Sequence, residues 1–125
     1  MPVTMELREN GRVFYYCVRD PLRLSDLIPL YEQNRKIRDQ SLYPIHAIAN
    51  LSEVRSLPQE ILSLSRISPD ITHPRAGYIF AITASPFVRS IVDLLIRLVN
   101  SNRFRVFATE GEAWDAMRKV IEGVS

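Results

Sequence analysis

Small polar residues stand at three points of the chain where an apolar run gives way to a helix-start pattern. They are Asn50 and Ser52, Thr83 and Ser85, and Thr109. If the apolar runs are parallel strands, these residues meet at one edge of a sheet, where α/β proteins bind ligands. Helix N-termini at that edge attract anions, and Arg89 lies one turn into the third expected helix. The pattern indicates a ligand or anion site, with helix capping by the same residue types as the alternative.

Side chains for nucleophilic or acid–base catalysis form no recognisable set. Cys17 and His46 fall in different apolar runs, and His73 lies in an expected loop. The chain has 4 glycines and contains neither a Gly-x-Ser-x-Gly elbow nor a Gly-rich phosphate loop. An enzyme would require distant residues such as Ser52, Asp70 and His73 to converge. We therefore expect a protein without catalytic activity.

The contents of the chain also argue against several ligand classes. Its single cysteine and 2 histidines lack the spacing of a zinc site, so neither a metal nor a cofactor is expected. The balance of 16 Lys and Arg against 14 Asp and Glu gives a formal charge of +2. Nucleic-acid binding requires basic charge clustered on one face, and this balance gives no such indication.

The chain carries no pattern of a membrane-spanning or secreted protein. The most apolar stretch, residues 87–99, is interrupted by Arg89, Asp93 and Arg97, and it is too short to cross a bilayer. Residues 1–10 lack the basic and apolar regions of a signal peptide. We therefore expect a cytoplasmic protein without integral membrane association.

Strand and helix patterns alternate along the chain after an opening hairpin at Asn10-Gly11. Apolar runs predict strands at residues 4–9, 12–18, 45–51, 77–84 and 103–108. Helices are expected at residues 25–41, 57–68, 86–100 and after Thr109. The order ββαβαβαβα predicts one α/β domain over residues 1–125, with a five-stranded, mostly parallel sheet and four helices. Right-handed crossovers are expected to place helices on both faces.

Capping residues predict where the helices begin. The expected N-caps are Ser25, Ser56, Ser85 and Thr109. Gln59 and Glu112 stand three residues after two of these caps and complete capping boxes. The inward side of the first helix is expected to carry Leu27, Leu30, Tyr31, Asn34 and Ile37.

The third expected helix, residues 86–100, has more apolar surface than one core contact requires. Its apolar residues fill an arc of about 200°, whereas a surface helix needs a stripe somewhat wider than about 100°. The excess is either further burial or a surface for a partner. A homodimer is its simplest use, because two-fold dimers are the commonest oligomers. The interface candidates are Val88, Val92, Ile96 and Val99.

The element order is similar to that of the STAS-like fold of anti-sigma factor antagonists and of the related SpoIIAA-like family. Residues 49–54 (ANLSEV) resemble the end of the family's third strand, where an aspartate precedes Leu-Ser. The family then carries Asp-Ser-Ser/Thr-Gly, whose Ser or Thr is phosphorylated by a regulatory kinase. Residues 57–60 (LPQE) replace that signature, which leaves Ser56 as the modification candidate, with helix capping as its alternative role.

The resemblance implies a non-catalytic module of bacterial regulation that binds a partner protein. The apolar arc of residues 87–99 adds the expectation of a homodimer through that helix. A small-molecule or lipid-binding domain at the carboxyl ends of the strands is the alternative. It predicts a concave apolar pocket of several hundred cubic ångströms near Asn50, Thr83 and Thr109.

Overall fold

A single five-stranded sheet organises the chain, of which the computed structural model describes residues 2–123. The strands are β1 (Val3–Arg8), β2 (Val13–Arg19), β3 (Ile45–Glu53), β4 (Ala76–Ile82) and β5 (Phe104–Phe107). They lie side by side in sequence order, with β1 antiparallel to β2 and all other neighbours parallel. The predicted α/β class and mixed, mostly parallel sheet are therefore confirmed.

Three of the four predicted helices form as continuous helices. They are α1 (Leu24–Asp39), α4 (Pro86–Val99) and α5 (Glu110–Ile121). The cap of α1 differs from the prediction, because the helix begins after Arg23 and not after Ser25. The carboxylate of Asp26 accepts the Arg23 backbone N–H at 3.0 Å, which satisfies a free donor at the helix start.

The prediction of one helix over residues 57–68 is wrong. The segment forms the 3₁₀ helix η1 (Gln59–Ser63) and then α2 (Leu64–Ile67), and α3 (Pro69–Thr72) follows. The hydroxyls of Ser63 and Ser65 donate to backbone carbonyl oxygens three residues back, at 2.7 and 3.1 Å. Such bonds compete with the backbone bonds of an α-helix. Pro69, whose ring cannot continue a helix, then separates α2 from α3.

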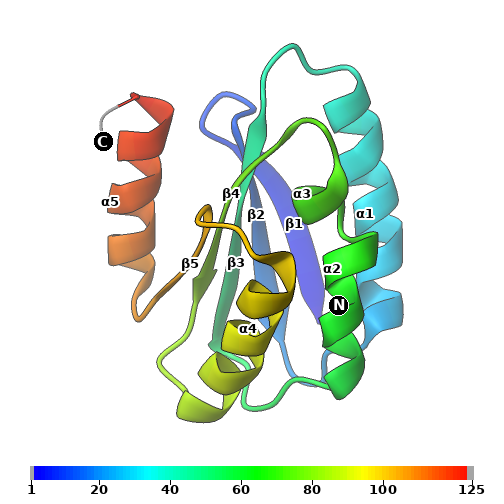
Figure 1. Cartoon of the computed structure of the whole chain (residues 1–125), viewed down its shortest axis with the longest axis vertical. Coiled ribbons are helices and arrows are strands. Elements are labelled where there is room, and N and C mark those ends of the chain that lie inside the picture. The colour runs from blue at the N-terminus through cyan, green and yellow to red at the C-terminus, as the bar shows by residue number, and fades with distance from the viewer. Residues whose placement is uncertain (1, 124–125) are drawn as a thin grey trace.

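The helices cover the two faces of the sheet unequally. The crossovers advance across the sheet in one direction, and crossovers of one hand then leave their helices on one face. Figure 1 shows α1, α2, α3 and α4 on that face and α5 alone on the other. Each face has its own core: Leu27, Leu64 and Val92 belong to the first, and Trp114 and Met117 of α5 belong to the second. Helices do cover both faces, but the expectation that the crossovers place them there is wrong: the crossover helices share one face, and the second is covered by α5, which follows the last strand.

Local signals fix the hairpin and two of the helix starts. Glu9, Asn10 and Gly11 turn with positive φ values of 54°, 56° and 82°, as the Asn-Gly pair predicts. The Ser85 hydroxyl accepts the Val88 backbone N–H at 3.3 Å, so the predicted cap of α4 is confirmed. The predicted cap of α5 is confirmed as well, because the Thr109 hydroxyl accepts the Glu112 backbone N–H. The capping box predicted there forms only in this half, since the Glu112 carboxylate accepts the Thr109 hydroxyl and not the Thr109 backbone N–H.

Candidate functional site

The carboxyl edge of the parallel strands brings the predicted ligand residues together, but their side chains bind one another. The Asn50 amide donates to the Tyr15 hydroxyl at 2.9 Å, and its oxygen accepts the Ser52 hydroxyl at 2.6 Å. Thr83 is buried, and its hydroxyl oxygen accepts the Ser85 backbone N–H at 3.1 Å. These bonds shape the turns after β3 and β4.

The remaining predicted ligand residues also have local partners. The Thr109 hydroxyl accepts the Glu112 backbone N–H at 3.3 Å and donates to the Glu112 carboxylate at 2.9 Å. Arg89 lies 3.7 Å from Asp93, one turn further along α4. The ligand site itself stays a prediction, and the local bonds agree with the alternative of caps and turns.

Acidic side chains stand beside these residues. The Glu110 carboxylate accepts the Tyr15 hydroxyl at 2.7 Å and the Trp114 indole N–H at 3.3 Å. Burial is the main reason that the pKa of Tyr15 is raised, and its bond to Glu110 adds to the rise. Because Glu110 and Glu112 both begin α5, their negative charge opposes an anion at this edge. The Tyr15–Glu110 bond instead ties α5 to β2.

The three candidate residues for catalysis do not converge. His73 Nε2 lies 2.7 Å from the Asp39 carboxylate, and Asp70 pairs with Arg38. Ser52 stands near the opposite end of β3 from Ile45. Ile45 marks the end near Asp70, because its carbonyl oxygen accepts a hydrogen bond from Arg38, the partner of Asp70. Ser52 lies seven residues after Ile45 along the strand, or about 23 Å at 3.3 Å per residue. The arrangement therefore contains no Ser–His–Asp relay through these residues.

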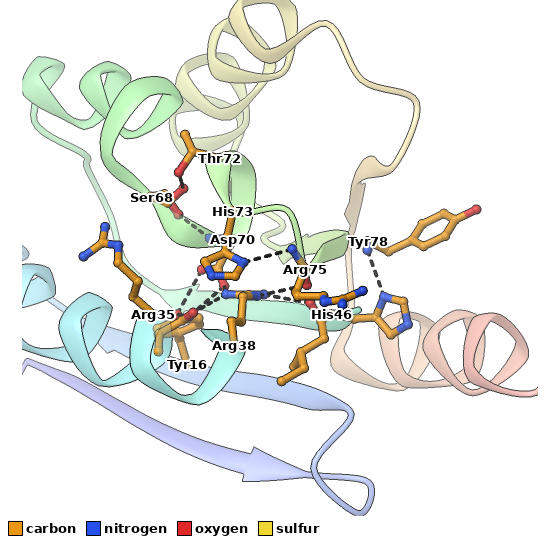
Figure 2. A network of polar contacts seen from close by, with 12 residues as sticks. Tyr16, Arg35, Arg38, His46, Ser68, Asp70, Thr72, His73, Arg75 and Tyr78 are labelled. Carbon is orange, nitrogen blue, oxygen red and sulfur yellow. Dashed lines mark hydrogen bonds and ion pairs between the residues drawn. The ribbon is translucent and has the colours of Figure 1, made fainter. Parts of the chain in front are cut away.

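A buried polar network occupies the space between α1, α3 and the sheet (Figure 2). The guanidinium of Arg38 lies 2.8 Å from the Asp70 carboxylate and donates to the Ile45 carbonyl oxygen at 2.7 Å and to the Arg75 carbonyl oxygen at 3.3 Å. It also donates to Asn34. The charged pair is thus bonded on several sides, as a buried ion pair requires.

Tyr16 completes the network from β2. Its hydroxyl donates to the Asp70 carboxylate at 2.9 Å and accepts the Asn34 amide at 2.6 Å. Burial, followed by the charge of Asp70, holds the pKa of Tyr16 well above its usual value. The sequence patterns did not predict this network, although Asn34 and Arg38 continue the spacing of the buried residues Leu27 and Tyr31. Ile37, predicted to face inward, is exposed.

His46 is a second buried titratable group, at the start of β3. Its Nδ1 accepts the Tyr78 backbone N–H at 2.9 Å (Figure 2). Burial lowers the pKa of His46 to about 4, and the nearby charges of Arg12, Arg38 and Arg103 act in the same direction. The imidazole is therefore neutral at pH 7 and accepts a hydrogen bond as part of the fold.

Helix α4 presents a different surface from the one predicted. Val88 and Val92 are buried against the sheet, and Ile96 and Val99 are partly buried against the same core. The assignment of Val88 and Val92 to an interface is therefore corrected. The exposed apolar residues are Phe87, Leu94 and Leu98, with exposed fractions of 80%, 42% and 59%. Together with the partly exposed Ile91 they form a row that we call the α4 stripe.

Other site types find no support in the described part of the chain. Residues 2–123 contain no cluster of three or more His, Cys, Asp or Glu side chains placed to hold a metal ion. Among the same residues, no helix has the length and apolar character needed to cross a bilayer. Comparisons with family models, curated proteins and solved structures give no significant match to the chain.

Proposed function

We propose that this chain is a non-catalytic, STAS-like interaction module that associates with a second copy of itself through the α4 stripe. The observation that carries the proposal is the exposure of three large apolar side chains, Phe87, Leu94 and Leu98, on one side of one helix. Scattered apolar side chains are normal on a protein surface, whereas a continuous row of them marks an interaction site.

The spacing of the α4 stripe favours a second copy of this chain as the partner. Phe87, Ile91, Leu94 and Leu98 are separated by four, three and four residues, so the row reads the same in both directions. Two such helices, antiparallel around an axis between residues 92 and 93, bring Phe87 against Leu98 of the second copy. Ile91 then meets Leu94 of that copy. A two-fold interface needs such a self-complementary surface.

The charged residues of α4 adjoin the stripe without interrupting it. At about 100° per residue, Arg89, Asp93 and Arg97 lie together on the other exposed side of the helix. In a helix pair they form a polar rim around an apolar centre, which is the usual anatomy of an interface. A single helix pair buries less area than a standard interface of about 1,600 Å². We therefore expect weak, concentration-dependent association.

The element order supports the STAS-like character of the proposed module. The separation of Ser52, Asp70 and His73, which form no catalytic set, supports its non-catalytic character. A STAS-like module would bind its partner proteins without changing them chemically. Ser56 is exposed and precedes η1 without capping it, because the cap position is Pro58. Its accessibility is compatible with modification by a kinase.

Light scattering coupled to size exclusion, over a range of protein concentrations, tests the association. We expect the average mass to rise with concentration for the native chain, and Leu98→Asp and Phe87→Asp to remain monomeric. Leu42→Asp is the matched control, because Leu42 is 89% exposed but lies outside α4. A native chain that stays monomeric up to about 1 mM, a concentration at which even a weak dimer is populated, would refute the proposal. Equal effects of the α4 and Leu42 changes would refute it too.

A further inference from the structure

The sheet carries unusually small side chains where α1 and α4 cover it. Ala49 of β3 lies directly beside Ala81 of β4, and Ala47 lies two residues before Ala49 on the same face. Central parallel strands are ordinarily rich in Val, Ile and Leu. On the opposite face the same strands carry Ile48 and Phe80, which fill the space beneath α5.

A cavity of about 90 Å³ lies over these alanines. Its lining comes from strands β2 to β5, from α1 and α4 and from the η1–α3 segment, with Leu27, Ile61 and Leu95 among the side chains. The helices around it are held by other contacts: Arg38 ties α1 to Asp70, and Val88 anchors α4 to the sheet. A close-packed interior relaxes only partly around missing volume, so the space remains open.

The cavity offers water few partners. Its lining is almost entirely apolar, and the polar side chains that reach it belong to Tyr16, Tyr31, Ser68 and Asp70. The Tyr16 hydroxyl and the Asp70 carboxylate bind each other, and the Ser68 hydroxyl oxygen accepts the Asp70 backbone N–H at 3.2 Å. Among residues 2–123, the buried side-chain atom without a partner is Arg12 Nε, and Arg12 does not line the cavity. A buried water needs two to four polar partners, whereas apolar cavities stay dry and accept apolar molecules.

We propose that this cavity is a binding site for a small apolar molecule, of the size of xenon or a compact hydrocarbon. A dry apolar cavity of about 150 Å³ accepts benzene or xenon. The smaller volume of this cavity fits xenon directly and requires a slight outward shift of the wall for a ring. The site is separate from the predicted ligand residues at the carboxyl edge, none of which lines it.

The route of entry follows from the weakest wall. The segment formed by η1, α2 and α3 consists of helices of five, four and four residues, too short to be stable by themselves. Segments of this kind open locally at a low free-energy cost. Leu57 and Ile91, both partly exposed, line the cavity at the entrance to η1 and on α4. The cavity is already partly open to the surface, and outward movement of η1 and α2 from α4 would widen the entrance between these two side chains.

Methyl NMR of the full chain with xenon, and separately with benzene, tests the proposal. We expect saturable shifts of the Ile61 and Leu95 methyl groups, with Ile48, on the other face of the sheet, unaffected. Ala49→Val and Ala81→Val reduce the cavity and should weaken binding of either probe at least tenfold. Ala84→Val adds the same methyl groups to an exposed residue outside the cavity and should leave binding unchanged.

Ala49→Val and Ala81→Val are both made in case one of them fails to fold. The binding of a probe is compared only for a variant whose methyl spectrum remains native. The proposal is refuted if the native chain shows no saturable shift with either probe. It is also refuted if the shifts at Ile61 and Leu95 are the same in the native chain and in a folded Ala49 or Ala81 variant. Neither result depends on self-association through α4.

Discussion

Arg38 and Asp70 form an ion pair of 2.8 Å whose side chains are 0% and 8% exposed. The pair joins the last turn of α1 to α3, beneath the helices that cover the sheet. It also places the carboxylate of Asp70 within reach of Tyr16 and Asn34. This contact holds together the part of the fold whose helices are shortest.

Removal of one partner of this pair should be severe. Arg38→Met leaves the Asp70 carboxylate buried without its cation, and we expect the free energy of unfolding to fall by about 3–5 kcal/mol. Urea denaturation followed by circular dichroism measures the loss. Arg19→Met is the control, because Arg19 pairs with Glu53 at 3.3 Å on the surface, where such pairs contribute about 0–1 kcal/mol. Similar losses for both variants would contradict the structural role of Arg38.

Acid should destabilise the chain through His46. The pKa of His46 is about 4 in the folded state, below the value of 6.5 for an unperturbed histidine. The unfolded chain therefore binds the proton first. The contribution of His46 to stability is complete above pH 6.5 and is lost as the pH falls from 6.5 toward 4.

Unfolding free energies at pH 7.5 and pH 4.5 measure this effect. The native chain should lose about 1–3 kcal/mol more than His46→Gln over this interval, because each unit by which burial lowers the pKa corresponds to about 1.36 kcal/mol. His73→Gln is the control, because His73 is the other histidine of the chain and lies beside an opposite charge, the Asp39 carboxylate. An identical acid response of His46→Gln and the native chain would show that His46 is not the sensitive group.

Gly77 should tolerate no side chain while His46 is present. A Cβ atom at Gly77 would overlap His46 Nδ1, so Gly77→Ala forces the imidazole or the strand to move. We expect a loss of about 1–3 kcal/mol, the usual range for overpacking. The double variant with His46→Ala should lose less than the sum of the two single changes.

Gly111 provides the opposite result as a control. Nothing lies within 4 Å of a Cβ atom at Gly111, which belongs to α5. Gly111→Ala should therefore raise stability by about 0.5–1 kcal/mol, because alanine loses less backbone entropy in a helix. Additive effects of Gly77→Ala and His46→Ala would argue against the close contact between these two residues.

Thr109 and Ser56, two of the four residues expected to cap helices, should differ in their effects. Thr109→Ala removes the capping bond to Glu112 and should cost about 1 kcal/mol. Ser56→Ala should stay within about 0.5 kcal/mol of the native chain, as for surface changes elsewhere. Thermal unfolding of both variants measures the difference. A larger loss for Ser56→Ala than for Thr109→Ala would contradict the cap assignments.

Much of the fold is predictable from local patterns in the sequence. The strands are strongly apolar, and the Asn-Gly turn and the caps at Ser85 and Thr109 act within three residues of themselves. These signals depend on interactions between residues that are close in the sequence, so they can be recognised without the structure. The element order then specifies the parallel sheet through the general rules of chain connection.

Features that depend on tertiary contacts are harder to predict. Arg38 is polar and long, so its burial becomes understandable only once Asp70 and the carbonyl oxygens of Ile45 and Arg75 are placed around it. The apolar arc of α4 is visible in the sequence as too wide for one contact. The sequence does not show which side of that arc faces the core. It therefore predicts Val88 and Val92 at an interface, whereas the exposed apolar residues are Phe87, Leu94 and Leu98.

Disulfide cross-linking between α4 helices measures the proposed pairing most directly. In a Cys17→Ser background, chains carrying Phe87→Cys are mixed with chains carrying Leu98→Cys and oxidised mildly. A disulfide needs Cα atoms about 4.4–6.8 Å apart. Antiparallel pairing brings residue 87 of one copy to residue 98 of the other, but it separates the two copies of residue 98 by about 16 Å along the helices. We expect cross-linked dimers in the mixture and almost none with Leu98→Cys alone. Equal cross-linking in both samples, or none in the mixture, would contradict association through the α4 stripe.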